Sequence, residues 1–75
     1  MDVSLAFGRA LRELRVSRGL TQEQLGFEAG LRRTFISSLE LGEKQPSLIT
    51  IHKLSLTFGL SMSELLESVE VELKK

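Results

Sequence analysis

Apolar residues recur along this chain at the three- and four-residue spacing of an α-helix, and no useful stretch alternates as a β-strand does. Near the start, Phe7, Leu11 and Leu14 share one helical face, which predicts a helix over residues 4–18 with Ser4 as its N-cap. Gly19 follows at the place where a glycine typically ends a helix. The pattern therefore predicts an all-α chain.

A second, short helix is predicted over residues 22–29. Thr21 and Gln24 have the spacing of a capping box, in which each side chain satisfies a backbone N–H of the other residue. Leu25 and Ala29 lie one turn apart and are expected to face the core. Gly30 ends this helix and can adopt the positive φ of a tight turn.

A third helix is predicted from residue 32 or 33 to residue 41, where Gly42 closes it. Its inward side is expected to carry Ile36, Leu39 and Glu40, and Phe35 lies at the boundary. The outward side is expected to carry Thr34, Ser37, Ser38 and Leu41.

Two further helices complete the pattern. One is predicted over residues 48–58, capped by Ser47 and stopped by Gly59, with a core stripe of Leu48, Ile51, Leu54 and Phe58. The other is predicted over residues 62–73, opened by a capping box of Ser61 and Glu64, with an apolar stripe of Leu65, Leu66, Val69 and Leu73.

A length of 75 residues predicts one domain, residues 1–75, whose single core is small. A domain of this size gains stability from dimerisation. The stripe on the last helix exceeds what one end of so small a domain hides, so we expect a dimer interface at Leu65, Leu66 and Val69.

The composition disfavours an enzyme. There is no cysteine and one histidine, His52, which excludes thiolate metal sites and makes a histidine metal site or a Ser-His-Asp triad improbable. No Gly-rich phosphate loop is present, so we expect no catalytic residue, no metal and no cofactor. No apolar run approaches a membrane span, and the N-terminus lacks the pattern of a signal peptide, so a cytoplasmic location is expected.

The net charge is zero, with ten basic and ten acidic residues, but the charges are unevenly placed. Four arginines lie in the first helix, two more stand at residues 32 and 33, and the C-terminal end is acidic. Arg9, Arg12 and Arg18 fit either phosphate contacts or an ordinary solvated face. A local basic face is enough to meet phosphates despite the neutral sum.

The segment from Thr21 to Gly42 carries the functional signal. Two short helices joined by a tight turn cross at a large angle, as in a DNA-reading helix-turn-helix. The polar outward residues can then reach base edges or phosphates in the major groove. Gln22, at the start of the first helix of the pair, is placed to hold a phosphate.

The run LTQEQLGFEAGLRRTFISSLELGEKQPSLITIHKLSLTFGLSMSEL, preceded by FGRALRELRVSRG, resembles the Xre/Cro family of phage-repressor-type helix-turn-helix domains. The resemblance covers about residues 7–66 and rests on the joint spacing of Gln22, Leu25, Gly30, Ile36, Leu39, Glu40, Gly42, Pro46, Ser47 and Gly59. It implies a five-helix, lambda-repressor-like fold that binds a pseudo-palindromic operator as a homodimer. Among small members of the family, the chain looks most like stand-alone regulators such as the controller proteins of restriction–modification systems.

The resemblance also implies roles for particular residues. It implies DNA contacts to bases and phosphates at Gln22, Arg32, Arg33, Thr34, Ser37, Ser38 and Lys44, the last from the loop after the third helix. It further implies a structural ion pair between Arg15 and Glu40. The expected partners are therefore double-stranded DNA and a second copy of the chain.

Three departures from the family pattern leave an alternative open. Arg32 replaces a small capping residue, Ser38 stands where a basic residue is common, and Leu41 stands where Asn or Arg is common. The neutral charge and an exposed Leu41 would also suit a protein-interaction module, such as an antitoxin, built on the same fold. The order of the motif and Arg33 favour DNA binding.

Overall fold

The computed structural model describes all 75 residues and contains five helices and no strand. They are α1 (Val3–Ser17), α2 (Gln22–Ala29), α3 (Arg33–Glu40), α4 (Leu48–Phe58) and α5 (Met62–Leu73). The predicted all-α class and the order of the five helices are confirmed. The predicted bounds of α2, α4 and α5 agree with the structure, and α3 ends one residue earlier than expected.

The first helix begins differently from the prediction. Its N-cap is Asp2, whose carboxylate accepts a hydrogen bond of 2.8 Å from the backbone N–H of Leu5. Ser4 lies inside the helix. Both residue types are good N-caps, but Asp2 comes first and adds a negative charge that the helix dipole favours at this end. The prediction of Ser4 as the cap was therefore wrong.

The other helix starts follow their capping residues. The capping boxes Thr21–Gln24 and Ser61–Glu64 are both formed, and Ser47 accepts a hydrogen bond from the backbone of Thr50. α3 is the exception, because Arg32 stands at its N-cap position without any side-chain capping bond. The loss of a cap that the sequence indicated there is confirmed.

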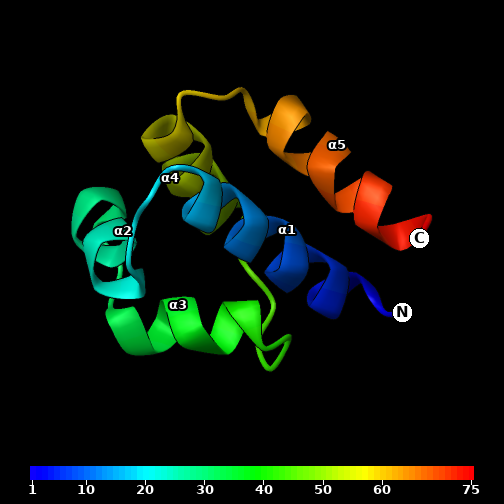
Figure 1. The fold of residues 1–75 in the computed structure, drawn as a ribbon, viewed down its shortest axis with the longest axis horizontal. Helices are drawn as coiled ribbons and strands as arrows, with labels where there is room; N and C mark the ends of the chain where they lie inside the picture. The colour runs from blue at the N-terminus through cyan, green and yellow to red at the C-terminus, as the bar shows by residue number, and fades with distance from the viewer.

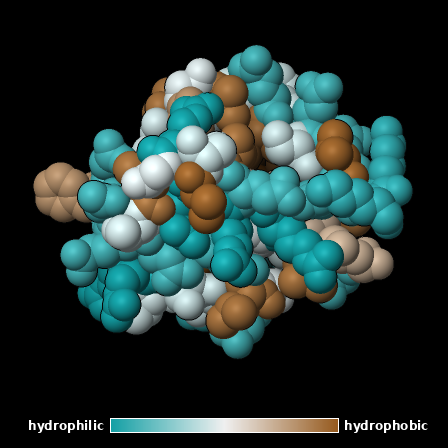
Figure 2. Space-filling view, viewed as in Figure 1, coloured by the Kyte–Doolittle hydropathy of each residue, from teal (hydrophilic) through white to brown (hydrophobic).

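One core joins all five helices. In Figure 1, α1 crosses the middle of the molecule, α3 lies below it, α2 lies to its left, and α4 and α5 lie above. The buried apolar residues are Ala6, Phe7, Ala10, Leu11, Leu25, Ala29, Ile36, Leu39, Leu54, Phe58, Leu65 and Val69. On the face seen in Figure 2, hydrophilic side chains predominate and apolar ones form small separate groups.

The predicted core stripe of α4 needs one correction. Leu54 and Phe58 are buried, but Leu48 is 70% exposed. At about 100° per residue, Leu48 points about 100° away from the middle of the arc that Leu54 and Phe58 define. Thr50 and Ile51 lie closer to that arc and cover the core in the first turn. Leu48 is therefore a surface residue.

Two glycines allow α3 and the turn before it to pack closely against α1 and α2. A Cβ atom on Gly8 would lie 2.3 Å from the backbone oxygen of Leu39, so α1 and α3 are in contact through their main chains. A Cβ atom on Gly26 would lie 2.5 Å from the backbone oxygen of Leu31, in the turn that precedes α3. Only glycine fits at either position without movement, so α3 is held against both α1 and α2.

None of the five helices combines the length and the apolar content that crossing a membrane requires.

Candidate nucleic-acid interface

The turn between α2 and α3 sets the direction of α3. Gly30 has φ 70° and ψ 35°, and the N–H of Leu31 donates to the carbonyl of Gly26 at 2.8 Å. The chain thus leaves α2 through a left-handed glycine and enters α3 after only two more residues. In Figure 1, α3 lies along the lower edge of the molecule, with α1 and α2 on its upper side only.

The two sides of α3 differ as predicted. Ile36 and Leu39 are fully buried on its inner side, and Phe35 is half-buried at the boundary. On the outer side, Arg33 and Thr34 are exposed and Ser37 is half-buried. This outer side therefore presents a cationic and two hydroxyl side chains from a helix whose other side is anchored in the core.

A small hollow between the start of α2 and the start of α3 brings four of the predicted DNA-binding residues together. Its lining is entirely polar and consists of Gln22, Arg33, Thr34 and Ser37. Hydrogen-bond donors and a guanidinium that converge in this way suit a phosphate or the edge of a base.

The predicted ion pair between Arg15 and Glu40 is present. Arg15 Nε donates to Glu40 Oε2 at 2.6 Å, and Arg15 Nη2 donates to Glu40 Oε1 at 3.1 Å. The side chain of Glu40 is only 5% exposed. The hydrogen bond to Glu40 raises the pKa of Arg15 above its ordinary value, so the guanidinium remains charged.

Glu40 has a second partner that the sequence did not reveal. Gln22 Nε2 donates to Glu40 Oε1 at 3.1 Å, across 18 positions of the chain. Because a carboxylate only accepts hydrogen bonds, the amide nitrogen of Gln22 must face Glu40. This bond fixes the Gln22 side chain in the lining of the polar hollow, so Gln22 has a structural role besides its predicted DNA contact.

Comparison with known proteins places this geometry in a family. The sequence profile of the helix-turn-helix family matches residues 11–65, which include α2, α3 and α4 entirely. The chain belongs to the helix-turn-helix family. The family predicted from the order of motif residues is confirmed.

The helix-turn-helix protein is similar to named regulators over nearly its whole length. It is 36% identical over 72 residues to the control protein C.MunI of a Mycoplasma species, a match that covers 95% of this chain and 97% of that protein. It is 39% identical over 67 residues to the control protein C.BamHI of Bacillus amyloliquefaciens, covering 88% of this chain and 83% of the relative.

A solved structure supports the same fold. The restriction–modification controller protein C.AhdI of Aeromonas hydrophila superposes with a TM-score of 0.78 at 41% sequence identity. That match covers 81% of this chain and 92% of the other. The five-helix architecture of the helix-turn-helix protein is therefore shared with a controller protein.

Three predicted contact residues lie outside the polar hollow. Arg32 is exposed just before α3, and Lys44 is exposed in the loop after it, with its Nζ 6.0 Å from the ring centre of Phe35. Ser38 Oγ donates to the carbonyl of Thr34 at 3.1 Å, so this hydroxyl is engaged within its own helix. None of the three ion pairs in the structure involves Arg32 or Lys44, so both cations are available for phosphates.

Arg18, the C-cap of α1, differs from the basic residues within the helix. Its Nη1 donates to the carbonyl of Phe58 at 2.7 Å, and its guanidinium lies 5.6 Å from the centre of the Phe58 ring. Arg18 therefore connects the end of α1 to the end of α4. Arg9 and Arg12 are exposed.

The predicted dimer interface on α5 needs correction. Leu65 is fully buried and Val69 nearly so within the core of the single chain, where α5 packs against α1 and α4. Leu66 is 38% exposed. Of the three predicted dimer residues, only Leu66 offers surface to a second copy.

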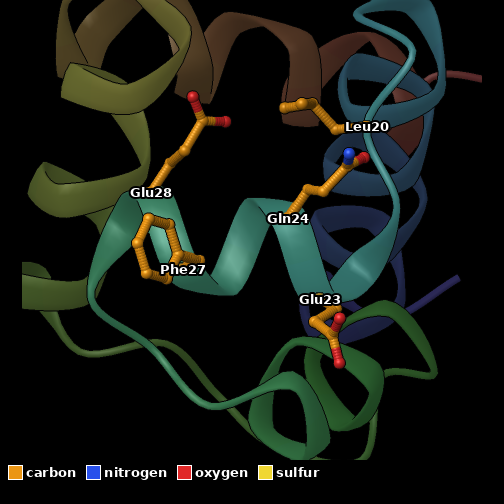
Figure 3. A pocket seen from close by; sticks show the side chains of 5 residues that line it. All are labelled: Leu20, Glu23, Gln24, Phe27 and Glu28. Atoms are coloured by element: carbon orange, nitrogen blue, oxygen red, sulfur yellow. The ribbon is translucent and has the colours of Figure 1, made fainter.

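The most exposed large apolar side chain was not anticipated. Phe27 on the outer side of α2 is 88% exposed and lines an open hollow with Leu20, Glu23, Gln24 and Glu28 (Figure 3). The signal was present in the sequence, because Phe27 lies two residues from both Leu25 and Ala29 and so points about 200° away from each on a helix. The structure contains no group of three residues able to hold a metal ion, and His52 is exposed.

Proposed function

We propose that this helix-turn-helix protein is a sequence-specific transcription regulator that binds double-stranded DNA as a homodimer, with α3 in the major groove. The observation that carries the proposal is the polar hollow of Gln22, Arg33, Thr34 and Ser37 at the uncovered edge of the molecule. The control proteins that the chain resembles over nearly their whole length support a regulatory role of the restriction–modification controller type.

The residues divide by the kind of contact they suit. Arg33 carries a guanidinium at the start of α3 and can donate two hydrogen bonds to guanine O6 and N7. Thr34 and Ser37 can reach neighbouring base edges, with less selectivity. Gln22, Arg32 and Lys44 flank these residues and suit phosphates, which position the protein on the duplex.

A homodimer fits a palindromic operator. If both copies place α3 on the same side of the duplex, the two half-sites lie about 34 Å apart, one turn of B-DNA. The proposal assigns no cofactor and no reaction to the chain, since binding energy alone accounts for regulation at an operator.

Selection of bound duplexes from a random DNA pool tests this proposal. We expect a palindromic consensus with half-sites one helical turn apart. Affinity for that consensus should fall with log[salt] at a slope of about −0.9 for each phosphate neutralised. The Arg33→Ala variant, carried through the same selection, should lose the preference at one base pair of each half-site. A pool that stays random at low salt contradicts the proposal and favours a protein partner.

A further inference from the structure

The bond between Gln22 and Glu40 limits how the side-chain amide of Gln22 can be turned. Gln22 Nε2 donates to Glu40 Oε1 at 3.1 Å, and this is the only hydrogen bond that the side chain makes. If the amide were turned over, Gln22 Oε1 would face the carboxylate, and two groups that only accept hydrogen bonds would meet. The amide nitrogen therefore stays on the side of Glu40, and the carbonyl oxygen is directed away from it.

Glu40 is itself held in place. Arg15 donates to both carboxylate oxygens, at 2.6 Å to Oε2 and at 3.1 Å to Oε1, and the side chain of Glu40 is only 5% exposed. A third bond, from Arg15 Nη1 to the carbonyl of Leu20 at 2.8 Å, fixes the arginine in turn. The orientation of the Gln22 amide is thus set by a support within the protein and not by the molecule that binds at its surface.

Two hydrogen-bonding groups of Gln22 remain free, the carbonyl oxygen Oε1 and the second N–H of Nε2. Gln22 lines the polar hollow together with Arg33, Thr34 and Ser37. A guanidinium only donates hydrogen bonds, and the two hydroxyl groups donate or accept. Gln22 therefore supplies the only side-chain carbonyl oxygen of this lining.

The groups that DNA presents differ in whether they can satisfy this oxygen. Phosphate oxygens accept hydrogen bonds, so they can bind the free N–H of Gln22 but not Oε1. In the major groove, adenine N6 and cytosine N4 carry amino groups that donate, whereas guanine O6, guanine N7 and thymine O4 only accept. An adenine or a cytosine therefore matches Oε1, and a guanine or a thymine at the same place leaves two acceptors facing each other.

We propose that Glu40 is a positioning residue for sequence recognition. By holding Gln22 Nε2, it directs Gln22 Oε1 to accept a hydrogen bond from the exocyclic amino group of an adenine or a cytosine. The inference rests on the proposed function and extends it, because it adds a base contact to the phosphate contact of Gln22. The free N–H of Gln22 remains available for that phosphate.

Binding to operators with single base analogues tests the base contact. In one half-site of the selected operator, each adenine in turn is replaced by unsubstituted purine and each cytosine by pyrimidin-2-one, which removes only the amino group. We expect one position at which this change weakens binding of the wild type about fivefold, the effect of one hydrogen bond. The base at that position identifies the donor as adenine or cytosine. The same change should not weaken binding of Gln22→Ala any further, and an equal effect on both proteins at every position overturns the inference.

Gln45→Ala is the matched control, because it removes an exposed amide side chain that lies outside the polar hollow. This variant should respond to every analogue as the wild type does. If it loses the response in the same way as Gln22→Ala, the effect does not come from the held amide and the inference fails.

Release of Gln22 tests the positioning role of Glu40. The double variant Arg15→Met/Glu40→Leu removes both members of the ion pair, so no charge remains buried, and circular dichroism checks its helix content. Its Gln22 amide can turn over. The preference for adenine or cytosine over guanine or thymine at the identified position, about tenfold in the wild type, should therefore fall toward equality. Weaker binding to all sequences with the preference intact would show that the pair serves stability alone and would overturn the proposal.

Glu40→Gln provides a second variant that keeps the size of the side chain and an oxygen for Arg15. Its amide can also donate to Gln22, so the Gln22 amide can turn over and the preference should fall in the same direction. An unchanged preference in either folded variant overturns the proposal. The palindromic consensus and the salt dependence of the proposed function do not require Gln22 to read a base, so a failure of either proposal is recognised by itself.

Discussion

Arg15 and Glu40 join the end of α1 to the end of α3 through two parallel hydrogen bonds, 2.6 Å from Nε to Oε2 and 3.1 Å from Nη2 to Oε1. Arg15 also donates from Nη1 to the carbonyl of Leu20 at 2.8 Å, and Glu40 also accepts from Gln22. The pair therefore touches α1, the segment before α2, the first residue of α2 and the last residue of α3. It connects the scaffold to both helices of the helix-turn-helix.

Replacement of Glu40 by leucine should destabilise the fold by about 3–5 kcal/mol, because it leaves the largely buried guanidinium of Arg15 without its counter-ion. The double variant Arg15→Met/Glu40→Leu should recover much of that loss, since no charge then remains buried. Urea unfolding monitored by circular dichroism gives both free energies. Surface substitutions typically change the free energy of unfolding by no more than about 0.5 kcal/mol. A change within this range for Glu40→Leu would show that the ion pair is unimportant for stability.

Gly8→Ala should destabilise the protein by about 1–3 kcal/mol, because the added methyl overlaps the main chain of Leu39 and Glu40 and forces α1 away from α3. Alanine is the better helix former, so helix propensity acts in the opposite direction. The control is Glu67→Ala, an exposed change on α5 that should cost little. Thermal unfolding of the two variants separates the effect of steric overlap from the effect of helix propensity. A Gly8→Ala variant more stable than the wild type would contradict the close contact between α1 and α3.

Arg33→Ala should cost about 1–3 kcal/mol in binding to the selected operator and should relax specificity at one base pair. Lys44→Ala is its matched control, because it removes one exposed cation from the loop rather than from α3. That variant should weaken binding to all sequences alike. It should also make the fall of log affinity with log[salt] less steep, by the contribution of about one phosphate contact. Titrations on operators with single base changes compare the two. Equal loss on every sequence for Arg33→Ala would exclude base reading by Arg33.

Glu64 should make the stability depend on acidity. The Ser61 backbone N–H and then the Ser61 hydroxyl hold the pKa of Glu64 below its ordinary value of 4.5. A carboxylate with a depressed pKa in the folded state contributes stability that is full above its unfolded pKa and is lost as the pH falls through the folded value. Glu64→Gln keeps an acceptor for the Ser61 N–H without the charge.

Urea unfolding of the wild type and of Glu64→Gln between pH 7 and pH 3 checks this dependence. The wild type should be the more stable of the two at pH 7, and the difference should shrink as the pH falls below 4.5. A difference that stays constant over this range would mean that the charge of Glu64 contributes nothing.

Local signals in the sequence were sufficient for most of the fold. Capping residues define the starts of α2, α4 and α5, and terminal glycines define the ends of α2 and α4, because each acts on backbone groups only a few positions away. α1 was misplaced at its start, because Asp2 and Ser4 both meet the requirements of an N-cap. Leu48 was misassigned because it points about 100° away from the middle of the arc that the buried Leu54 and Phe58 define.

The outward residues of the candidate site and the ion pair between Arg15 and Glu40 were predicted, and one supporting hydrogen bond was not. Arg33, Thr34 and Ser37 follow from the helical face, whereas the bond from Gln22 to Glu40 depends on how distant segments pack. The packing of α5 also depends on distant segments and could not be predicted from the local sequence. A stripe of apolar residues does not show whether a given leucine faces its own core or the surface, and the neighbours Leu65 and Leu66 differ, since Leu65 is fully buried and Leu66 is 38% exposed.

The main-chain contact at Gly8 has a consequence for the thermodynamics of binding. With no side chain between them, α1 and α3 have little freedom to slide or roll against each other. The backbone of α3 is therefore already ordered before any duplex arrives. The conformational entropy lost on association then comes mainly from exposed side chains such as Arg33. Each side chain that becomes fixed costs about 0.5–1.5 kcal/mol of binding free energy. A rigid helix of eight residues thus loses little backbone entropy when it binds a duplex, and this favours affinity.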